Sequence, residues 1–141
     1  MRIVSFSWTT PALVALRKSC TRRDWPDSYA RRFHAGQRVQ AYDKSARHGG
    51  QAVAIIQLTM DPYKERTSEM PDQDYELEGF QYFDTFPQEL PKNAGGPLLA
   101  KGTMQERFLA WRAADELLWV VRFRVLKLLT PRRILQLGLG M

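Results

Sequence analysis

Alternation of apolar and polar side chains predicts three strands in the first 59 residues of the chain. The first is Arg2–Trp8, with Val4, Phe6 and Trp8 on one face and Ile3, Ser5 and Ser7 on the other. Gln37–Asp43 and Ala52–Thr59 follow, and Gly49-Gly50 between them is the turn signal of a hairpin. Because Ala52–Thr59 is the more apolar of the two, it is predicted to lie near the centre of a sheet.

Helix signals fall at three places. Thr10-Pro11 suits a capping residue followed by a first helical position, and a short apolar helix is predicted to continue through Ala12–Leu16. Pro71–Glu78 is predicted as a second short helix, ended by Gly79. Thr103-Met104-Gln105-Glu106 is a capping box, which predicts a third helix after it.

The clearest strand follows Asp115-Glu116, where Val121–Val125 alternate with arginines. The alternation shifts at Leu126, which predicts a β-bulge there. Taken alone, these short strands and short helices predict an α+β fold in a small mixed or antiparallel barrel. We expect residues 1–129 to form one domain, with 84–102 as a long loop or insertion and 130–141 as a C-terminal tail.

The distribution of charge changes what this fold is expected to bind. The net charge is +6. Residues 1–66 carry 12 Lys and Arg against 5 Asp and Glu, residues 67–89 carry none against 7, and residues 90–141 carry 9 against 3. A basic surface with one acidic segment favours a polyanionic partner, most often nucleic acid. A basic composition without such a partner stays open as the alternative.

Other features bear on compartment and cofactors. A single cysteine, Cys20, excludes an internal disulfide, and it suits a buried position better than a nucleophile. No stretch reaches the roughly 18 apolar residues of a membrane span, and the N-terminal residues lack the pattern of a signal peptide. We therefore expect a cytoplasmic protein without a membrane partner. His34 and His48 have no metal-ligand spacing, so neither a metal nor another cofactor is expected.

Hydrogen-bond donors are dense just after the first predicted helix. Lys18, Thr21, Arg22 and Arg23 lie within six residues, directly after an apolar segment. Lys18 and Thr21 are three residues apart, so their side chains can meet on a helical turn or a tight loop. Desolvation and neighbouring cations such as Arg17 would lower the pKa of Lys18 enough for it to activate a hydroxyl. The alternative is helix capping with solvated charge.

This cluster resembles the signature of the ASCH domain, Gly-x-Lys-x-x-x-x-Arg, at Lys18 and Arg23. The resemblance continues through Gly36 and Glu78-Gly79-Phe80, covers roughly the first 83 residues, and extends more loosely to the last strand. ASCH domains are similar to the PUA RNA-binding domain. The resemblance therefore implies an α+β fold, a small PUA-like (ASCH) β-barrel with two or three short flanking helices. The Gly of the signature falls at Leu16, so its backbone freedom is absent or provided otherwise.

One branch of that family resembles this chain closely, the small amidohydrolases that remove the acetyl group from 4-acetylcytidine. The resemblance implies that Lys18 activates Thr21 for attack on the acetyl carbonyl while Glu78 carries the proton. It also implies that Arg23 positions the substrate or the oxyanion. Those enzymes have no obvious equivalent of residues 84–102, so the substrates of the two could differ.

The chain as a whole leaves several functions open. The partner that we expect is RNA or a modified nucleoside, with contacts from Arg17, Arg22, Arg23, Trp25, Arg32 and Tyr42. Aromatic rings interleaved with arginines could stack bases beside phosphate contacts, although Trp25 suits a core position equally well. The alternatives are a ribonuclease that acts on single-stranded RNA and a non-catalytic RNA-binding or adaptor module.

Overall fold

The computed structural model describes residues 1–92, 94–96 and 101–129. The strands in these ranges are β1 (Ile3–Ser5), β2 (Cys20–Arg23), β3 (Arg38–Tyr42), β4 (Ala52–Leu58), β5 (Tyr63–Arg66) and β6 (Leu117–Leu128). The α-helices are α1 (Thr10–Val14), α2 (Asp27–Ala30), α3 (Asp74–Leu77), α4 (Phe80–Thr85) and α6 (Met104–Ala114), and the 3-10 helices are η1 (Ser7–Thr9), η2 (Ala46–His48), η3 (Thr67–Glu69) and η4 (Pro87–Glu89). The predicted tail, 130–141, and residues 93 and 97–100 of the predicted loop lie outside the described residues.

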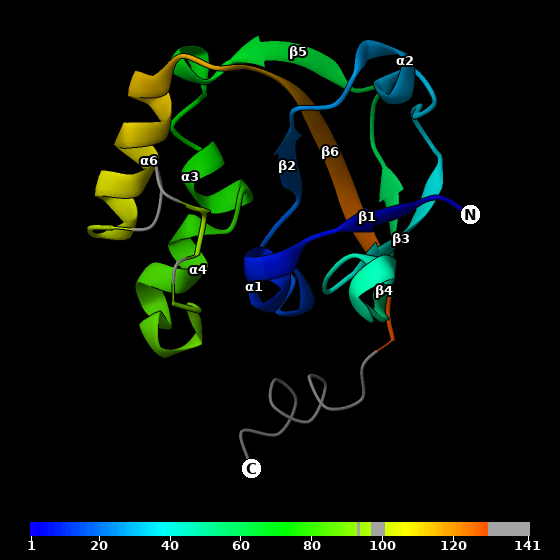
Figure 1. The fold of residues 1–141 in the computed structure, drawn as a ribbon, viewed down its shortest axis with the longest axis horizontal. Coiled ribbons are helices and arrows are strands. Elements are labelled where there is room, and N and C mark those ends of the chain that lie inside the picture. The colour runs from blue at the N-terminus through cyan, green and yellow to red at the C-terminus, as the bar shows by residue number, and fades with distance from the viewer. Residues whose placement is uncertain (93, 97–100, 130–141) are drawn as a thin grey trace.

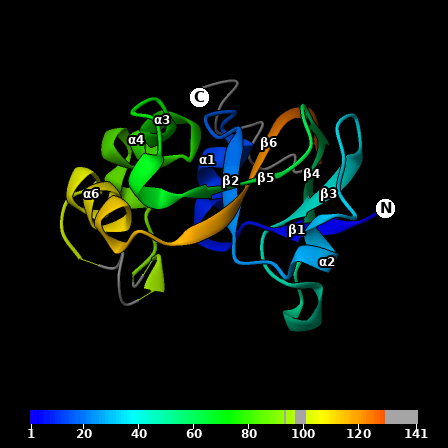
Figure 2. The same ribbon diagram turned by 90° about the horizontal axis from the view of Figure 1, so that it is seen from above.

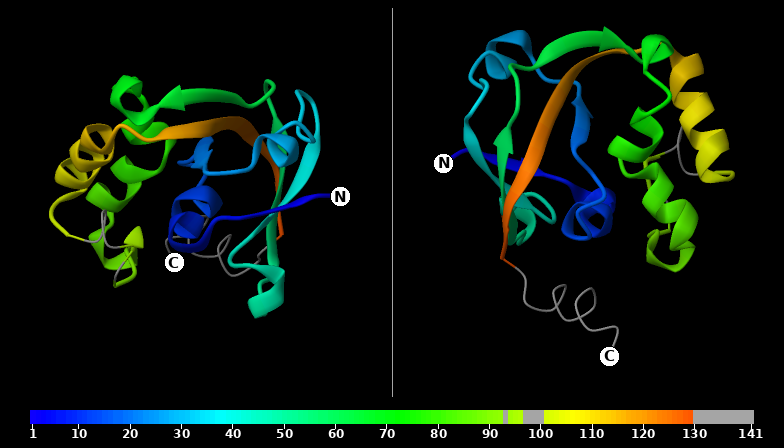
Figure 3. Two further views of the ribbon diagram at one scale, coloured as in Figure 1. Left: turned by 45° about the horizontal axis from the view of Figure 1, so that its top comes forward. Right: turned by 180° about the vertical axis from the view of Figure 1, so that it is seen from behind.

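Within the described ranges, the strands form a curled sheet in the order β1-β3-β4-β6-β2, and β5 also pairs with β6. β1 is parallel to β3, and the other pairs are antiparallel. The first half of β6 pairs with β2 and β5, and its second half pairs with β4. Figure 1 shows this long strand running through the middle of the molecule, and Figure 3 shows the sheet curling around it. The result is a mixed α+β fold with a half-barrel sheet.

Three local predictions are confirmed. β4 lies between β3 and β6, so it is a central strand. Opposite it, Ile55 pairs with Lys127 and Ile56 pairs with Val125, which leaves Leu126 as the extra residue of a bulge. The capping box is formed as well, since the N–H of Glu106 donates to the Thr103 hydroxyl while the Glu106 carboxylate accepts from the N–H of Thr103.

The first predicted strand is too long. β1 ends at Ser5, and the chain turns into η1 at Ser7, whose φ is +45°. The N–H of Phe6 donates to the carbonyl of Tyr42 at 2.9 Å, which is the last contact of this segment with β3. Trp8 therefore does not share a face with the strand residues before it, and packs against Phe80 and Phe83 instead.

The first predicted helix is also too long, and Thr10 is its first helical residue instead of its cap. α1 ends at Val14, and Leu16 has a left-handed backbone with φ +62°. The chain then becomes extended, and Cys20–Arg23 pairs with β6 as strand β2. Thr21, Arg22 and Arg23 of the donor-rich segment thus lie in a strand and not at a helix end, whereas Lys18 precedes the strand in a loop. The elements β5, α2 and α4 were not predicted, because their short segments have no clear apolar period.

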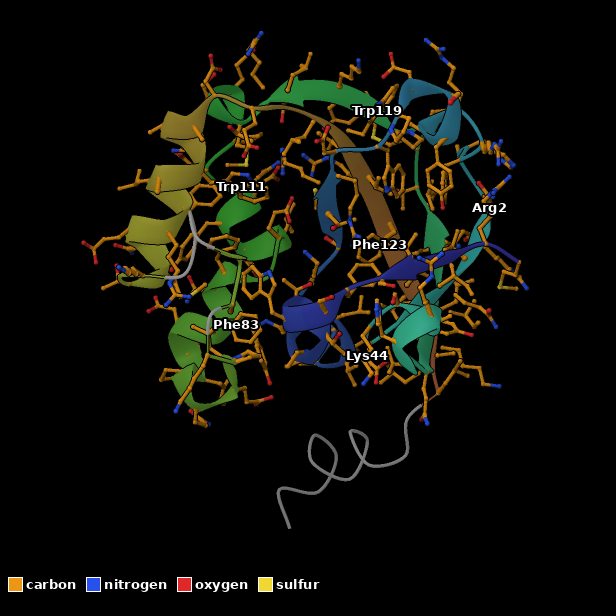
Figure 4. The ribbon with its side chains drawn as sticks, in the orientation of Figure 1. Arg2, Lys44, Phe83, Trp111, Trp119 and Phe123 are labelled. Carbon is orange, nitrogen blue, oxygen red and sulfur yellow. The ribbon has the colours of Figure 1, made fainter. Side chains whose placement is uncertain are left out.

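Two hydrophobic cores lie on either side of β2. The first fills the curled sheet and includes Phe6, Leu13 and Phe123, whereas the second packs α4 against α6 through Phe80 and Trp111. Figure 2 shows the helices α3, α4 and α6 gathered on one side of the strands, and Figure 4 shows Phe123 and Trp111 in these separate regions. Among the described residues, no helix has the length and apolar character that crossing a membrane requires.

Candidate functional site

A cavity of about 610 Å³ lies at the boundary between the two cores. Its walls come from the end of β1 and η1, from β2, from the start of α4, and from α6. Described residues of the predicted 84–102 loop, from Pro91 to Gly96, also line it. The cavity brings Lys18, Thr21, Arg23 and Glu78 to one place, together with Arg22.

Lys18 and Glu78 form a buried ion pair in this cavity. Lys18 follows α1 and Glu78 caps the C-terminus of α3, and the two side chains are only 1% and 4% exposed. Lys18 Nζ donates to Glu78 Oε1 at 3.1 Å and to the carbonyl of Glu78 at 2.7 Å. Burial lowers the pKa of Lys18 below its ordinary value, and the charge of Glu78 opposes that shift only in part. Lys18 is therefore more easily deprotonated than a surface lysine.

Gly79 sits against this pair. Its φ is +102°, and a Cβ added there would lie 3.0 Å from the Cβ of Ala12 and 3.6 Å from Cδ of Lys18. The left-handed backbone and the close approach of the α1 segment both favour glycine at this position. The turn that ends α3 thus lets Glu78 reach Lys18.

Thr21 and Arg23 alternate with Arg22 along β2, so they project from the opposite face of the strand. Arg23 Nε donates to Thr21 Oγ1 at 3.0 Å, and the guanidinium lies 5.3 Å from the centre of the Phe6 ring. Burial lowers the pKa of Arg23 to about 10, with Glu78 opposing the shift, so the group stays charged at neutral pH. Among the described residues, the Thr21 hydroxyl donates to no acceptor and its proton is available for transfer.

Of the two arrangements left open for Lys18 and Thr21, a helical turn or a tight loop, the helical turn is not found. Lys18 lies in a loop and Thr21 in an extended strand, and Lys18 Nζ bonds to Glu78 alone within the described ranges. What the structure supplies instead is a shared cavity that both side chains line.

Arg22 lines the cavity and is at the same time held by carboxylates. Its guanidinium is fully buried, and it bonds to Glu78 at 2.8 Å, Asp74 at 2.7 Å and Glu65 at 2.6 Å. Burial alone would lower the pKa of Arg22, but these carboxylates, Glu78 foremost, raise it well above its ordinary value. Its two terminal nitrogens are thus held by three carboxylates, and Arg22 orients Glu78, whereas its buried Nε has no hydrogen-bond partner among the described residues.

Three charged members of this network, Glu65, Asp74 and Arg122, were not among the predicted site residues. Asp74 is 0% exposed and binds Arg122 through both carboxylate oxygens, at 3.1 and 2.9 Å. Arg122 also donates to the hydroxyl of Tyr63 at 3.0 Å. One sequence signal existed for Asp74, since it lies four residues before Glu78 and so on the same face of a helix. No sequence signal marked Arg122 as a site residue, because a basic residue that alternates with apolar ones in a strand usually faces water.

The other predicted contact residues do not line the cavity. Arg17 and Arg32 are exposed, and Tyr42 lies at the end of β3. Trp25 packs against the first core, with its ring stacked on Phe33 at 4.6 Å between centroids. Of the two positions considered for Trp25, a ligand contact and a place in the core, the structure shows the place in the core.

Cys20 lies beside the ion pair on β2. It is fully buried, its Sγ is 3.6 Å from Glu78 Oε2, and burial together with the charge of Glu78 raises the pKa of its thiol well above the ordinary value. A thiolate is strongly disfavoured there. In the part of the chain that the structure describes, no group of three or more His, Cys, Asp or Glu side chains is arranged to hold a metal ion.

Comparison with known proteins gives a likeness of fold. No protein-family model matches the chain, and no curated protein matches it. Among solved structures, the crystal structure of protein EF3133 from Enterococcus faecalis V583, assigned to the family DUF984, has a TM-score of 0.53 and 18% sequence identity over 92% of this chain and 82% of that chain. The two share an architecture. At this identity the match carries no information on activity.

Proposed function

We propose that this protein binds a modified nucleoside in the cavity and hydrolyses an amide on its base, with Thr21 as the nucleophile. The observation that carries the proposal is the convergence of two polar pairs on one cavity, the Lys18–Glu78 ion pair and the Thr21–Arg23 hydrogen bond. A nucleophile, a lysine with a lowered pKa, a carboxylate and a cation are the parts that acyl transfer requires.

The size and walls of the cavity support a nucleoside as ligand. Small-molecule sites typically measure about 300–1,000 Å³, and this one is about 610 Å³. Trp8, Phe80 and Trp111 line it, so flat apolar surfaces lie close to the polar groups. Aromatic rings of this kind commonly stack on nucleobases.

The reaction divides into two steps. In the first, Lys18 as neutral amine takes the proton of the Thr21 hydroxyl while Oγ1 attacks the acyl carbonyl carbon. The bond from that carbon to the amide nitrogen breaks, and Glu78 passes the proton from Lys18 to the leaving amine. In the second, water hydrolyses the Thr21 ester, which releases the carboxylic acid and restores the hydroxyl. The Nε–H of Arg23, which donates to Oγ1, stabilises the negative charge that develops on Oγ1 as its proton leaves and again as the ester bond breaks.

The fold is in keeping with this proposal and with a PUA-like barrel. DUF984, the family of the structural neighbour, is itself ASCH-like and PUA-like. The Lys18 and Arg23 positions that resemble the ASCH signature lie in the cavity wall. We therefore include membership of the ASCH group in the proposal.

Release of acetate from 4-acetylcytidine tests the proposal directly. We expect the wild-type protein to release acetate, and Thr21→Val to lower the rate by about 10³-fold or more because no nucleophile remains. Affinity for the nucleoside should change little, since valine has nearly the shape of threonine. Thr59→Val is the matched control, because Thr59 is exposed and lies outside the cavity.

The alternatives give different results in the same samples. If the wild-type protein releases no acetate at any pH, the amidohydrolase proposal is wrong. Cleavage of single-stranded RNA that Thr21→Val does not slow would favour a ribonuclease with another nucleophile. Salt-sensitive RNA binding without either reaction would favour the binding module.

A further inference from the structure

The charges that line the cavity are unbalanced. Four cationic side chains, Lys18, Arg22, Arg23 and Lys92, face one carboxylate, Glu78. Lys18 and Arg22 both bond to Glu78, and Arg22 bonds in addition to carboxylates behind the cavity wall. These two cations are therefore compensated within the protein, which leaves Arg23 and Lys92.

Arg23 has no carboxylate partner among the described residues. Its Nε–H is used by Thr21, and its guanidinium faces the Phe6 ring, but its two terminal amino groups make no hydrogen bond in the described part of the chain. Neither terminal nitrogen is among the buried atoms that lack a partner, so both donors are open to solvent and an anion can reach them. Burial is the main cause of the lowered pKa of Lys18, and the charge of Arg23 adds a smaller contribution in the same direction.

Lys92 reaches the cavity from a separate part of the chain. It lies on the segment after η4, is exposed, and has no ion pair with a described residue. Because it is exposed and also lines the cavity, it lies where a ligand would enter. Arg23 near Thr21 and Lys92 at the entrance thus present two uncompensated positive charges to the same ligand.

We infer that the cavity takes an anionic ligand, a nucleoside that carries an oxyanion held by Arg23 and Lys92. This inference rests on the proposed function and narrows its substrate class. The oxyanion could be the phosphate of a mononucleotide or a carboxylate on the acyl group. A guanidinium offers paired donors that match either group, and an ammonium adds a point charge. A neutral nucleoside would leave both cations unpaired.

Three ligands on one scaffold test the inference. Binding of 4-acetylcytidine, its 5′-monophosphate and 4-succinylcytidine is measured by quenching of tryptophan fluorescence, since Trp8 and Trp111 line the cavity. We expect at least one anionic ligand to bind about tenfold or more tightly than 4-acetylcytidine at low salt, with the preference shrinking as salt is added. The ligand that shows the preference identifies the source of the oxyanion.

Single substitutions show which residues cause the preference for the anionic ligand. Lys92→Gln should reduce the preference for the anionic ligand about two- to fivefold, as expected for an exposed ion pair, and Arg23→Gln should reduce it further. Lys127→Gln is the control, because Lys127 is exposed on β6 and does not line the cavity. Since Lys92 is exposed, its replacement leaves the fold intact even if Arg23→Gln does not fold.

The outcomes separate this inference from the proposed function. If 4-acetylcytidine is hydrolysed and binds as tightly as both anionic ligands, the anion subsite is wrong and the proposed function stands. A preference that neither variant reduces also overturns the subsite. If a single-stranded oligonucleotide binds tenfold more tightly than any of the three, the ligand is nucleic acid and the inference fails. If none of the compounds binds, the nucleoside pocket and the subsite are both wrong.

Discussion

Leu16 has a backbone conformation that L-residues rarely adopt. Its φ is +62°, where the chain leaves α1 and the N–H of Arg17 donates back to the carbonyl of Ala12 at 2.9 Å. A left-handed residue with a Cβ costs about 1–2 kcal/mol. The side chain is 59% exposed, so burial offsets little of this cost. The Gly of the ASCH signature falls at this position, and the backbone that a glycine would supply is present here with leucine.

Leu16→Gly is therefore expected to stabilise the fold. Relief of the left-handed strain outweighs the entropy that a glycine loses, about 0.5–1 kcal/mol, so the free energy of unfolding should rise by up to about 1 kcal/mol. Urea unfolding followed by circular dichroism measures it. Leu16→Ala is the control, because alanine keeps the Cβ and should give no such gain. A lower stability for Leu16→Gly would show that the turn carries no strain.

The protonation of Lys18 should control the pH dependence of hydrolysis. Only the neutral amine can accept the proton of Thr21, so kcat/KM is expected to rise with pH through the pKa of Lys18, below the usual value of 10.5. Lys18→Arg, which stays protonated, should be inactive across this range. A profile that is flat from pH 6 to 10 would rule out Lys18 as the base.

The variant Glu78→Gln tests the role of Lys18 as the base, because it predicts the direction in which the pKa of Lys18 moves. The charge of Glu78 raises the pKa of Lys18 against the larger effect of burial. Removing that charge should move the rising limb to lower pH, even though the maximal rate falls because the proton carrier is lost. A purely structural role for Glu78 would lower the rate at all pH values and leave the limb in place.

At the scale of elements, β2 positions the site by alternation. Thr21 and Arg23 project from one face of the strand, and Cys20 and Arg22 project from the other. The antiparallel pairing of β2 with β6 places Cys20 opposite Arg122, so Arg22 and Arg122 both reach Asp74 on α3. The acidic face of α3 is thereby tied to two neighbouring strands.

Asp74→Asn should be strongly destabilising. The variant leaves Arg22 and Arg122 without the charge that both share, and breaking a buried ion pair costs about 3–5 kcal/mol. Asp72→Asn is a matched control two residues away, because Asp72 is 97% exposed and its pairing with Arg112 is at the surface. Urea unfolding of the two variants should separate them clearly. Equal stabilities would mean that the network does not hold α3 in place.

The sequence indicated some of these elements and missed others for physical reasons. β4, α6 and the bulge of β6 were predictable because their signals are local, in periodicity and capping. β2 was not, because its segment is polar and becomes a strand only through pairing with β6, nearly 100 residues away in the chain. Lys18, Thr21 and Glu78 were predicted from a family resemblance. The Arg22–Asp74–Arg122 network was not predicted, because it too depends on the pairing of β2 with β6.

At the scale of the whole molecule, the two cores are joined by shared elements. α1 places Leu13 in the first core and Ala12 in the second, and β6 places Val121 in the first and Leu118 in the second. The buried ion pairs between β2, β6 and α3 cross the same boundary. The cavity also lies at this boundary, so its geometry depends on both cores keeping their relative position.

We therefore expect the two cores to unfold as one unit, as the single-domain prediction requires. Trp25 packs against the first core, whereas Trp8 and Trp111 belong to the second. In a Trp119→Phe background, Trp25→Phe therefore removes the reporter of the first core, and Trp8→Phe with Trp111→Phe removes the reporters of the second. Fluorescence of both variants and far-ultraviolet circular dichroism should agree, within each variant, on a single transition. Adding Leu118→Ala, a truncation in the second core that costs about 2–5 kcal/mol, should lower the midpoint seen by Trp25 as much as the midpoint seen by Trp111. If only the Trp111 signal moves, the helical part unfolds separately from the half-barrel, and residues 1–129 are not one cooperative domain.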